Sequence, residues 1–195
     1  MSALTTDVYG RTLTSTDADQ QTTKTTYTPT TGAAPTAIVS TDPMQQTLSQ
    51  TYDPLRGLML TQTTAAGYVT KAQYNALGRI TAVFRPGITA ATNKYSYTLA
   101  PDKPSSVITQ TLNDDGSYRS SELLMDSLLR PRETQIATVD GRRDVTDTVY
   151  DTHGWGIKST GPYAADGAPE ATLVQAQDGD IPSEAGFTYD GAGRK

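Results

Sequence analysis

The stretch Tyr74-Asn75-Ala76-Leu77-Gly78-Arg79 decides the predicted fold, because it has the composition of a tight turn between two strands. Asn at its second position can accept a hydrogen bond from a backbone N–H about two residues later, and Gly at its fifth position adopts a positive φ without steric cost. The Tyr favours the end of the incoming strand, and the Arg opens the return strand. The stretch therefore predicts a β-hairpin turn, which we call a corner.

Variants of this corner occur at five other places in the chain. They are 6–11, 52–57 with Gly and Arg exchanged, 125–130 with Leu in place of Gly, 150–155 with Trp in place of Arg, and 189–194. The residues assigned a structural role at the corners are Asp7, Gly10, Arg11, Tyr52, Asp53, Gly57, Tyr74, Asn75, Gly78, Arg79, Asp126, Arg130, Tyr150, Asp151, Gly154, Tyr189, Asp190, Gly193 and Arg194. Corners in series predict an all-β repeat protein of antiparallel hairpins.

A second set of turns, rich in Asp and Gly, lies between the corners. The separation is 11 residues from Asp42 to Asp53, 12 from Asp114 to Asp126, and 11 from Asp140 to Asp151. A strand of about 5 or 6 residues and a turn occupy that length of chain. One repeat is thus a two-stranded ribbon that must stack on its neighbours, because a lone ribbon is only marginally stable.

Composition supports a sheet without a dense core. The hydrophobic fraction is 35%, below the globular average of about 45%, and the chain has 34 Thr. Thr favours strands with at least one wetted face. The best helical candidate, from Ser120 to Leu129, overlaps a corner, so we interpret it as a buried strand followed by a turn.

The whole chain, residues 1–195, is predicted to be one repeat region with two inserts that interrupt its rhythm, at about 85–104 and 161–183. We expect loops or irregular strands on one edge there, with Tyr95 to Thr98 as a strand in the first insert. Both ends are expected to be cut, so that the chain is a fragment whose sheet edges invite edge-to-edge association.

Charge argues against several partners. A net charge of −5 and a pI near 4.8 disfavour nucleic acid, which is bound through clustered Lys and Arg. The doublet Arg142-Arg143, flanked by Asp140 and Asp144, predicts a solvated turn. The chain has no Cys, no apolar run near the roughly 20 residues of a membrane span, and no visible signal peptide.

Candidate catalytic and metal-binding residues are few. His153 is the only His, and its place between Asp151 and Gly154 is typical of an exposed turn. The groups Asp114-Asp115 and Asp178-Gly179-Asp180 have the residue types of calcium or glycosidase sites, but Asp beside Gly is ordinary turn chemistry. Nucleotide-binding and nucleophile-elbow motifs are missing. We therefore predict no enzyme, no cofactor and no metal.

A series of tyrosines allows two interpretations. Its members are Tyr27, Tyr52, Tyr74, Tyr95, Tyr97, Tyr118, Tyr150, Tyr163 and Tyr189. They are either platforms for sugar rings or residues that stack on one another between adjacent hairpins. Their recurrence at turns favours packing, and Trp155 is interpreted as a packing residue on the same seam.

The corners at 74–79, 150–154 and 189–194, and Thr41-Asp42-Pro43 ahead of Tyr52-Asp53, resemble the YD repeats of RHS proteins. The runs 74–86 and 127–135 are similar to RHS proteins of filamentous soil actinobacteria. The resemblance covers nearly the whole chain and implies a spiral of hairpins that closes into a hollow shell. In insecticidal toxin complexes and bacterial polymorphic toxins such a shell encloses a toxic C-terminal domain, and in teneurins a similar shell serves at the cell surface.

The resemblance implies a structural segment of an RHS-repeat shell that encapsulates or presents a C-terminal toxin or effector domain outside this chain. Its partners would be the remaining RHS repeats and that toxin domain, in a protein that is secreted or held at the bacterial cell surface. The alternative function is a carbohydrate-binding or adhesin-like module whose partners are surface glycans.

Overall fold

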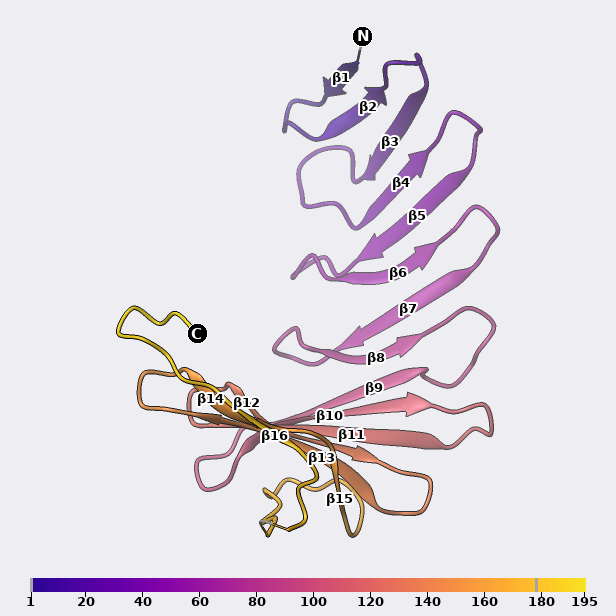
Figure 1. Ribbon diagram of the computed structural model, residues 1–195. Coiled ribbons are helices and arrows are strands. Elements are labelled where there is room, and N and C mark those ends of the chain that lie inside the picture. Colours follow the sequence, from indigo (N-terminus) through magenta and orange to yellow (C-terminus); the bar gives the residue numbers. More distant parts are fainter. Residues whose placement is uncertain (1, 178) are drawn as a thin grey trace. The chain divides into compact units, whose positions relative to one another are not determined.

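The computed structural model describes residues 2–177 and 179–195, and these residues form sixteen β-strands and no helix (Figure 1). The all-β prediction is confirmed. None of the described segments is an apolar helix of the length that a membrane span needs. The chain divides into two compact units, Met1–Thr92 and Asn93–Lys195.

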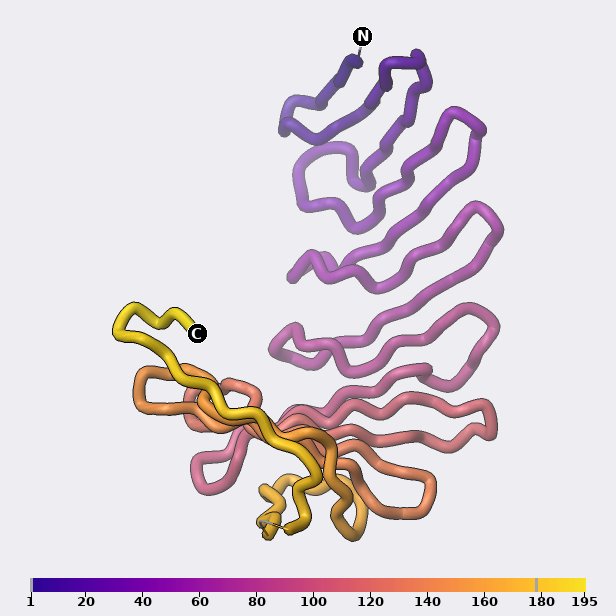
Figure 2. Tube along the Cα trace, in the orientation of Figure 1, coloured from indigo at the N-terminus to yellow at the C-terminus, as the bar shows by residue number. Residues whose placement is uncertain are grey.

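The first unit is an antiparallel meander in which each strand pairs with the next one in the chain. Its strands are β1 (Ala3–Thr6), β2 (Thr12–Thr16), β3 (Thr22–Thr28), β4 (Ala37–Thr41), β5 (Thr47–Tyr52), β6 (Met59–Thr63), β7 (Val69–Tyr74) and β8 (Ile80–Phe84). Figure 2 shows this part of the chain running back and forth in successive hairpins.

The second unit is also an antiparallel meander over most of its length, but its last strands pair differently. Its strands are β9 (Asn93–Thr98), β10 (Ser105–Leu112), β11 (Tyr118–Met125), β12 (Pro131–Ala137), β13 (Arg143–Tyr150), β14 (Gly156–Thr160), β15 (Tyr163–Ala165) and β16 (Glu184–Gly186). Strands β9 to β14 pair in chain order, and β16 pairs with β14. Strand β15 turns back onto β13 instead.

One turn geometry joins most of these strands. At Asn75, the residue's N–H donates to the Arg79 carbonyl at 2.9 Å, and the Gly78 N–H donates to the Asn75 carbonyl at 3.0 Å. Gly78 has a φ of 77°, as a three-residue hairpin loop ending in a left-handed residue requires. The same bonding pattern occurs at the opposite ends of the hairpins, in the turns that begin at Asp17, Asp42, Thr64, Asn113 and Thr138.

Few apolar side chains are buried in the first unit. Hydroxyl pairs link neighbouring strands, with Thr5 2.6 Å from Thr14 and Thr51 2.6 Å from Thr61. Ala82 and Ala91 are the buried apolar residues described in this unit, whereas Leu124, Val145 and Tyr163 are buried in the second. The sheet is therefore held largely by its backbone ladder and by polar cross-strand pairs.

The interpretation of Ser120 to Leu129 as a strand and a turn is confirmed, because β11 ends at Met125 and a corner follows. The strand predicted in the first insert, Tyr95 to Thr98, is confirmed as part of β9, which pairs with β10 from Asn93 to Thr98.

The described residues of the second insert, 161–183, form the short strand β15 and otherwise irregular segments, in keeping with the predicted loops or irregular strands, and part of the insert covers a face of the sheet. Strand β15 pairs with β13, with Arg143 opposite Ala165, and residues 168–174 lie on side chains of β12 and β13. The physical reason is the composition of that sheet face. It buries polar side chains that need hydrogen-bond partners, and the insert supplies them.

Candidate functional site

Each corner is closed by its acidic or amide residue. Asp126 Oδ1 accepts hydrogen bonds from the N–H groups of Leu128 and Arg130, both at 2.9 Å. Its Oδ2 accepts from Arg130 Nε at 2.7 Å. One carboxylate thus satisfies two backbone donors of the turn and fixes the Arg that opens the return strand. We call this arrangement the corner clasp.

The clasp recurs with little variation. Asp7, Asn75, Asp151 and Asp190 each accept the N–H groups of the second and fourth following residues, at 2.9–3.0 Å. The left-handed residues that complete these turns are Gly10, Gly78, Gly154 and Gly193. Asp53 begins a turn one residue longer, in which the Gly57 N–H reaches the Asp53 carbonyl. Exchanging Gly and Arg in this corner moves the left-handed position by one residue.

The clasp also sets the protonation of its carboxylates. Burial alone would raise the pKa of Asp126, but the hydrogen bonds from Arg130 and Leu128 outweigh burial and hold its pKa below the ordinary value. The backbone and side-chain hydrogen bonds from Arg194 lower the pKa of Asp190 likewise. A clasp therefore favours the ionised carboxylate.

Replacing Asp126 by Ala should reduce the free energy of unfolding by about 1–2 kcal/mol, because two backbone donors lose their acceptor. Asp126→Asn should cost less than half of that loss, since the native Asn75 makes the same two bonds. Urea unfolding followed by fluorescence of Trp155, the single Trp, measures both. Equal losses in the two variants would show that the charge, and not the acceptor oxygen, matters.

A second interaction ties several hairpins to the preceding one through a Tyr hydroxyl, whereas the hydroxyl of the corner residue Tyr52 donates to Gln50 Oε1 of its own strand at 3.1 Å. The Tyr74 hydroxyl donates to the Met59 carbonyl, Tyr150 to Pro131, and Tyr189 to Gly156, each at 2.9 Å. These acceptors lie just beyond the preceding corner. Tyr27 makes the equivalent bond to the Thr12 carbonyl at 3.0 Å.

The rings of Tyr27, Tyr150 and Tyr189 pack against the last residue of the preceding corner. They do not stack on one another, as the prediction had them. Arg11 Cζ lies 4.5 Å from the centre of the Tyr27 ring, and Arg130 Cζ lies 4.1 Å from that of Tyr150. Trp155 takes the place of Arg against Tyr189, with ring centres 5.2 Å apart. These tyrosines have their hydroxyls bonded and their rings covered, which suits packing and leaves little of them for a sugar ring.

The remaining candidate residues take part in turns. His153 stacks on Trp155 with ring centres 4.9 Å apart, and Asp151 accepts its N–H. Asp115 accepts the N–H and hydroxyl of Ser117, and Asp180 accepts the Gln177 N–H. Asp178 lies outside the described residues. In the described part of the chain, no three His, Asp or Glu side chains gather as a metal site would need.

A cluster that sequence reasoning missed lies in the second unit. Glu133 and Gln135 are 2% and 0% exposed, although both are polar. Arg143, predicted to lie in a solvated turn, is 7% exposed and donates to the Ala168 carbonyl at 2.5 Å and to Glu170 Oε1 at 2.9 Å. Its doublet neighbour Arg142 stays on the surface. We call Glu133, Gln135 and Arg143 the clamp, and residues 166–176 the strap.

Two carboxylates face each other beside the clamp. Glu133 is directly opposite Asp147 across the β12–β13 pair. Asp147 is held by Arg132 at 2.6 Å and by the Tyr163 hydroxyl at 2.7 Å. Burial raises the pKa of Glu133, hydrogen bonds from Gln135 and the Val174 N–H oppose the rise, and the nearby Asp147 adds to it. Burial and the Asp147 carboxylate also raise the pKa of the Tyr163 hydroxyl.

A raised pKa makes the Glu133 contribution depend on pH with a definite sign. The folded state binds the proton more tightly than the unfolded state, so this stability is complete below the ordinary Glu pKa of 4.5 and is lost as pH rises through the folded pKa. The difference in unfolding free energy between the wild type and Glu133→Gln should therefore shrink from pH 4 upward. Denaturant titrations of both proteins across this range measure it. A difference that is constant, or grows with pH, would contradict the raised pKa.

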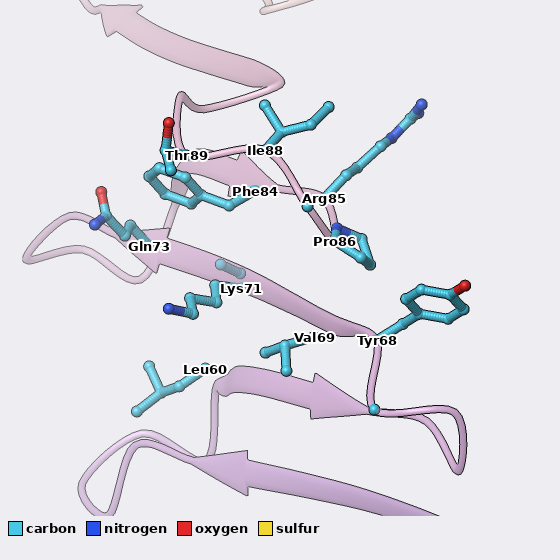
Figure 3. A pocket seen from close by; sticks show the side chains of 13 residues that line it. Leu60, Tyr68, Val69, Lys71, Gln73, Phe84, Arg85, Pro86, Ile88 and Thr89 are labelled. Carbon is cyan, nitrogen blue, oxygen red and sulfur yellow. The ribbon is translucent and has the colours of Figure 1, made fainter.

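A groove of the first unit has a volume of about 900 Å³ and is shown in Figure 3. Val69 and Phe84 line it from β7 and β8, and Lys71 lies opposite Phe84 in the strand pair. Tyr68, 63% exposed, and Arg85 extend at one end. The sequence has no acidic residue between Asp53 and Asp102, and within the described residues Lys71 and Arg85 form no ion pair.

These contacts define a class of protein, the all-β repeat proteins built from serial hairpins. A corner clasp closes the turns of the hairpins, and Tyr hydroxyls tie hairpins to the preceding ones. No family model matches the chain, and no curated protein matches it. Solved structures do resemble it.

One is TcdB2-TccC3, with a TM-score of 0.69 and 14% identity over 84% of this chain and 11% of that one. TcdB2-TccC3 without its hypervariable C-terminal region has a TM-score of 0.63 and 15% identity over 97% and 10%. The TcdB2-TccC3-Cdc42 structure has 0.59 and 16% over 85% and 10%. At this identity the likeness concerns the fold, and the predicted RHS-like fold is confirmed. The present chain spans about a tenth of the length of those chains.

Proposed function

We propose that the chain is a section of the wall of an RHS-repeat shell that encapsulates or presents a toxin or effector domain of the same parent polypeptide. The observation that carries this proposal is the repeated tie between hairpins, in which a corner Tyr bonds the backbone just past the preceding corner. Such a tie lets one hairpin be added after another without a central core. The likeness in fold to TcdB2-TccC3 supports it.

The proposal gives the corner residues a structural role and assigns no catalytic step to the chain. The partners are the other RHS repeats and a C-terminal toxin domain, and the parent is a secreted or cell-surface protein of the actinobacterial RHS type that runs 74–86 and 127–135 resemble. Turnover of a glycoside or a nucleic acid by this chain alone would contradict the proposal.

The test uses the full parent polypeptide. Further corners and a C-terminal domain are expected in its reading frame, and limited proteolysis should leave that domain protected. A parent carrying Gly78→Val and Gly193→Val, which disturb two corners, should lose this protection. A parent with the exposed substitution Leu55→Ala serves as the control. Equal cleavage of the C-terminal domain in all three proteins would refute the wall function.

A second candidate function, binding of an acidic glycan, is favoured by the groove at Tyr68. The groove is lined by the exposed Tyr68 ring, which can serve as a stacking surface, and by Lys71 and Arg85, two cations that lack acidic neighbours in the sequence. On a glycan array, uronic-acid or sialylated glycans should bind, and Tyr68→Ala or Lys71→Gln should abolish the signal while Leu55→Ala leaves it unchanged. Binding that survives both groove substitutions would exclude this site.

A further inference from the structure

The three clamp residues present their side chains on one face of the sheet. Glu133 and Gln135 are two residues apart in β12, and Arg143 lies opposite Ala137 in β13, so all three share a face. They are 2%, 0% and 7% exposed. The strap covers them. A segment that covers these polar side chains must also supply their hydrogen-bond partners, and the strap does so.

The strap meets the clamp through its backbone at every second residue. Arg143 donates to the Ala168 carbonyl, and the Glu170 N–H donates to Gln135 Oε1 at 2.8 Å. Gln135 Nε2 donates to the Thr172 carbonyl at 2.8 Å, and the Val174 N–H donates to Glu133 Oε1 and Oε2 at 3.2 and 3.1 Å. The backbone groups that bond the clamp thus alternate along the strap, although the strap is bent at 166–168 and at 171–172 and is not a regular strand.

The strap residues whose backbone groups bond Arg143 and Gln135 have exposed side chains, namely Ala168, Glu170 and Thr172. The residues between them, such as Leu173, are half-buried. The charged contacts of the strap are Glu170 with Arg143 at 2.9 Å and Asp166 with Arg142 at 3.4 Å, and the side chains of Glu170 and Asp166 are 56% and 97% exposed. Pro169, which lacks an N–H, lies at a position whose N–H the clamp does not use, and its fixed φ suits an extended backbone.

We propose that the clamp is a binding site for a polypeptide segment that it recognises through backbone N–H and C=O groups rather than through a sequence, and that the strap occupies it in cis. The ligand must present N–H groups four residues apart, as Glu170 and Val174 do, with carbonyls at alternating positions between and before them. Proline is excluded at those two positions. The inference does not depend on the shell function, because it rests on contacts within the second unit alone.

Peptide binding to a chain with a released strap tests the proposal. Glu170→Pro combined with Val174→Pro removes both N–H donors and should free the clamp. The probes are a fluorescein-labelled peptide of residues 167–176, its scrambled version with Pro kept in place, and two forms N-methylated at the positions of 170 and 174 or of 171 and 173. Fluorescence anisotropy gives the Kd values.

The native and scrambled peptides should bind with similar Kd, and methylation at 171 and 173 should change little. Methylation at 170 and 174 should weaken binding about tenfold or more for each lost hydrogen bond. If the scrambled peptide fails while the native one binds, recognition is by side chains and the proposal is wrong. If no peptide binds, the strap is only a cover, and the proposal is wrong as well.

A second measurement avoids the released strap and any loss of folding. In the otherwise unchanged chain, Ala168→Ser, Glu170→Gln and Thr172→Val together alter the exposed side chains of the strap. Hydrogen exchange should show amides 170 and 174 protected as in the wild type, whereas Gln135→Leu should expose amide 170. Loss of protection in the triple variant would overturn recognition through the backbone.

Discussion

Replacing Gln135 by Leu is expected to lower the free energy of unfolding of the second unit by about 2–5 kcal/mol. The side chain is 0% exposed, and it bonds the Glu170 N–H, the Thr172 carbonyl and the Glu133 carboxylate at 2.8, 2.8 and 2.6 Å. Leu fills a similar volume but accepts and donates nothing. Two backbone groups of the strap and the buried Glu133 carboxylate then lose a partner, and a buried group left unpaired costs about 1–3 kcal/mol.

Urea unfolding followed by Trp155 fluorescence measures the effect, because Trp155 packs within the second unit against Tyr189. The matched control is Gln175→Leu, which makes the same chemical change at an exposed position of the strap and should stay within about 0.5 kcal/mol of the wild type. A Gln135→Leu protein as stable as this control would mean that the strap is not anchored through the clamp.

The difference between what the sequence predicted and what it missed follows from the distance between the interacting residues. A corner clasp joins residues two and four positions apart, as Asp126 does with Leu128 and Arg130. Its donors and acceptor lie within one short stretch, so the pattern of residue types can be recognised in the sequence wherever it occurs. The serial corners and the all-β fold could therefore be predicted from composition and spacing alone.

The clamp joins residues 25 to 41 positions apart, from Arg143 with Ala168 to Glu133 with Val174. Its partners on the strap are backbone groups, which every residue carries, so the strap sequence has no signature. Arg143 was placed in a solvated turn because of its acidic neighbours. It is the alternation of β13 that turns Arg143 to the covered face. One sequence signal did exist: Glu133 and Gln135 are two residues apart in a strand, which is the spacing of side chains on one face of a sheet.

Position 129 shows the opposite case, in which structure overrides the local signal. Leu129 takes the Gly position of its corner and has a φ of 59°, a conformation that costs an L-residue roughly 1–2 kcal/mol. Gln20 and Gln45 have φ values of 64° and 62° at the opposite ends of hairpins. The pairing of the flanking strands fixes the turn, and the residue at the Gly position of the corner adopts the positive φ that this turn requires. Gly at a corner thus lowers the cost of the turn rather than creating it.

Gly78→Val should accordingly destabilise the first unit by about 2 kcal/mol or more. Gly78 has a φ of 77°, and a β-branched residue is least tolerant of that region. A Cβ at this position would meet only Leu58 Cδ1 at 3.5 Å, an ordinary contact, so the loss reflects backbone conformation and not a clash. Thermal unfolding followed by far-UV circular dichroism, with hydrogen exchange of the β7 and β8 amides, measures the loss and places it.

Two further substitutions separate this cause from others. Gly78→Asn should lose less than Gly78→Val, because Asn enters the left-handed region more readily. Leu129→Gly should be neutral or stabilising by up to about 1 kcal/mol, since relief of the positive φ is offset in part by the greater entropy of unfolded Gly. If Val and Asn at position 78 were equally harmful, or if Gly at 129 destabilised the chain, conformational strain at the fourth turn position would not govern these corners. A Gly78→Val chain that folds normally but loses a defined activity would show that this corner is a site and not a structural module.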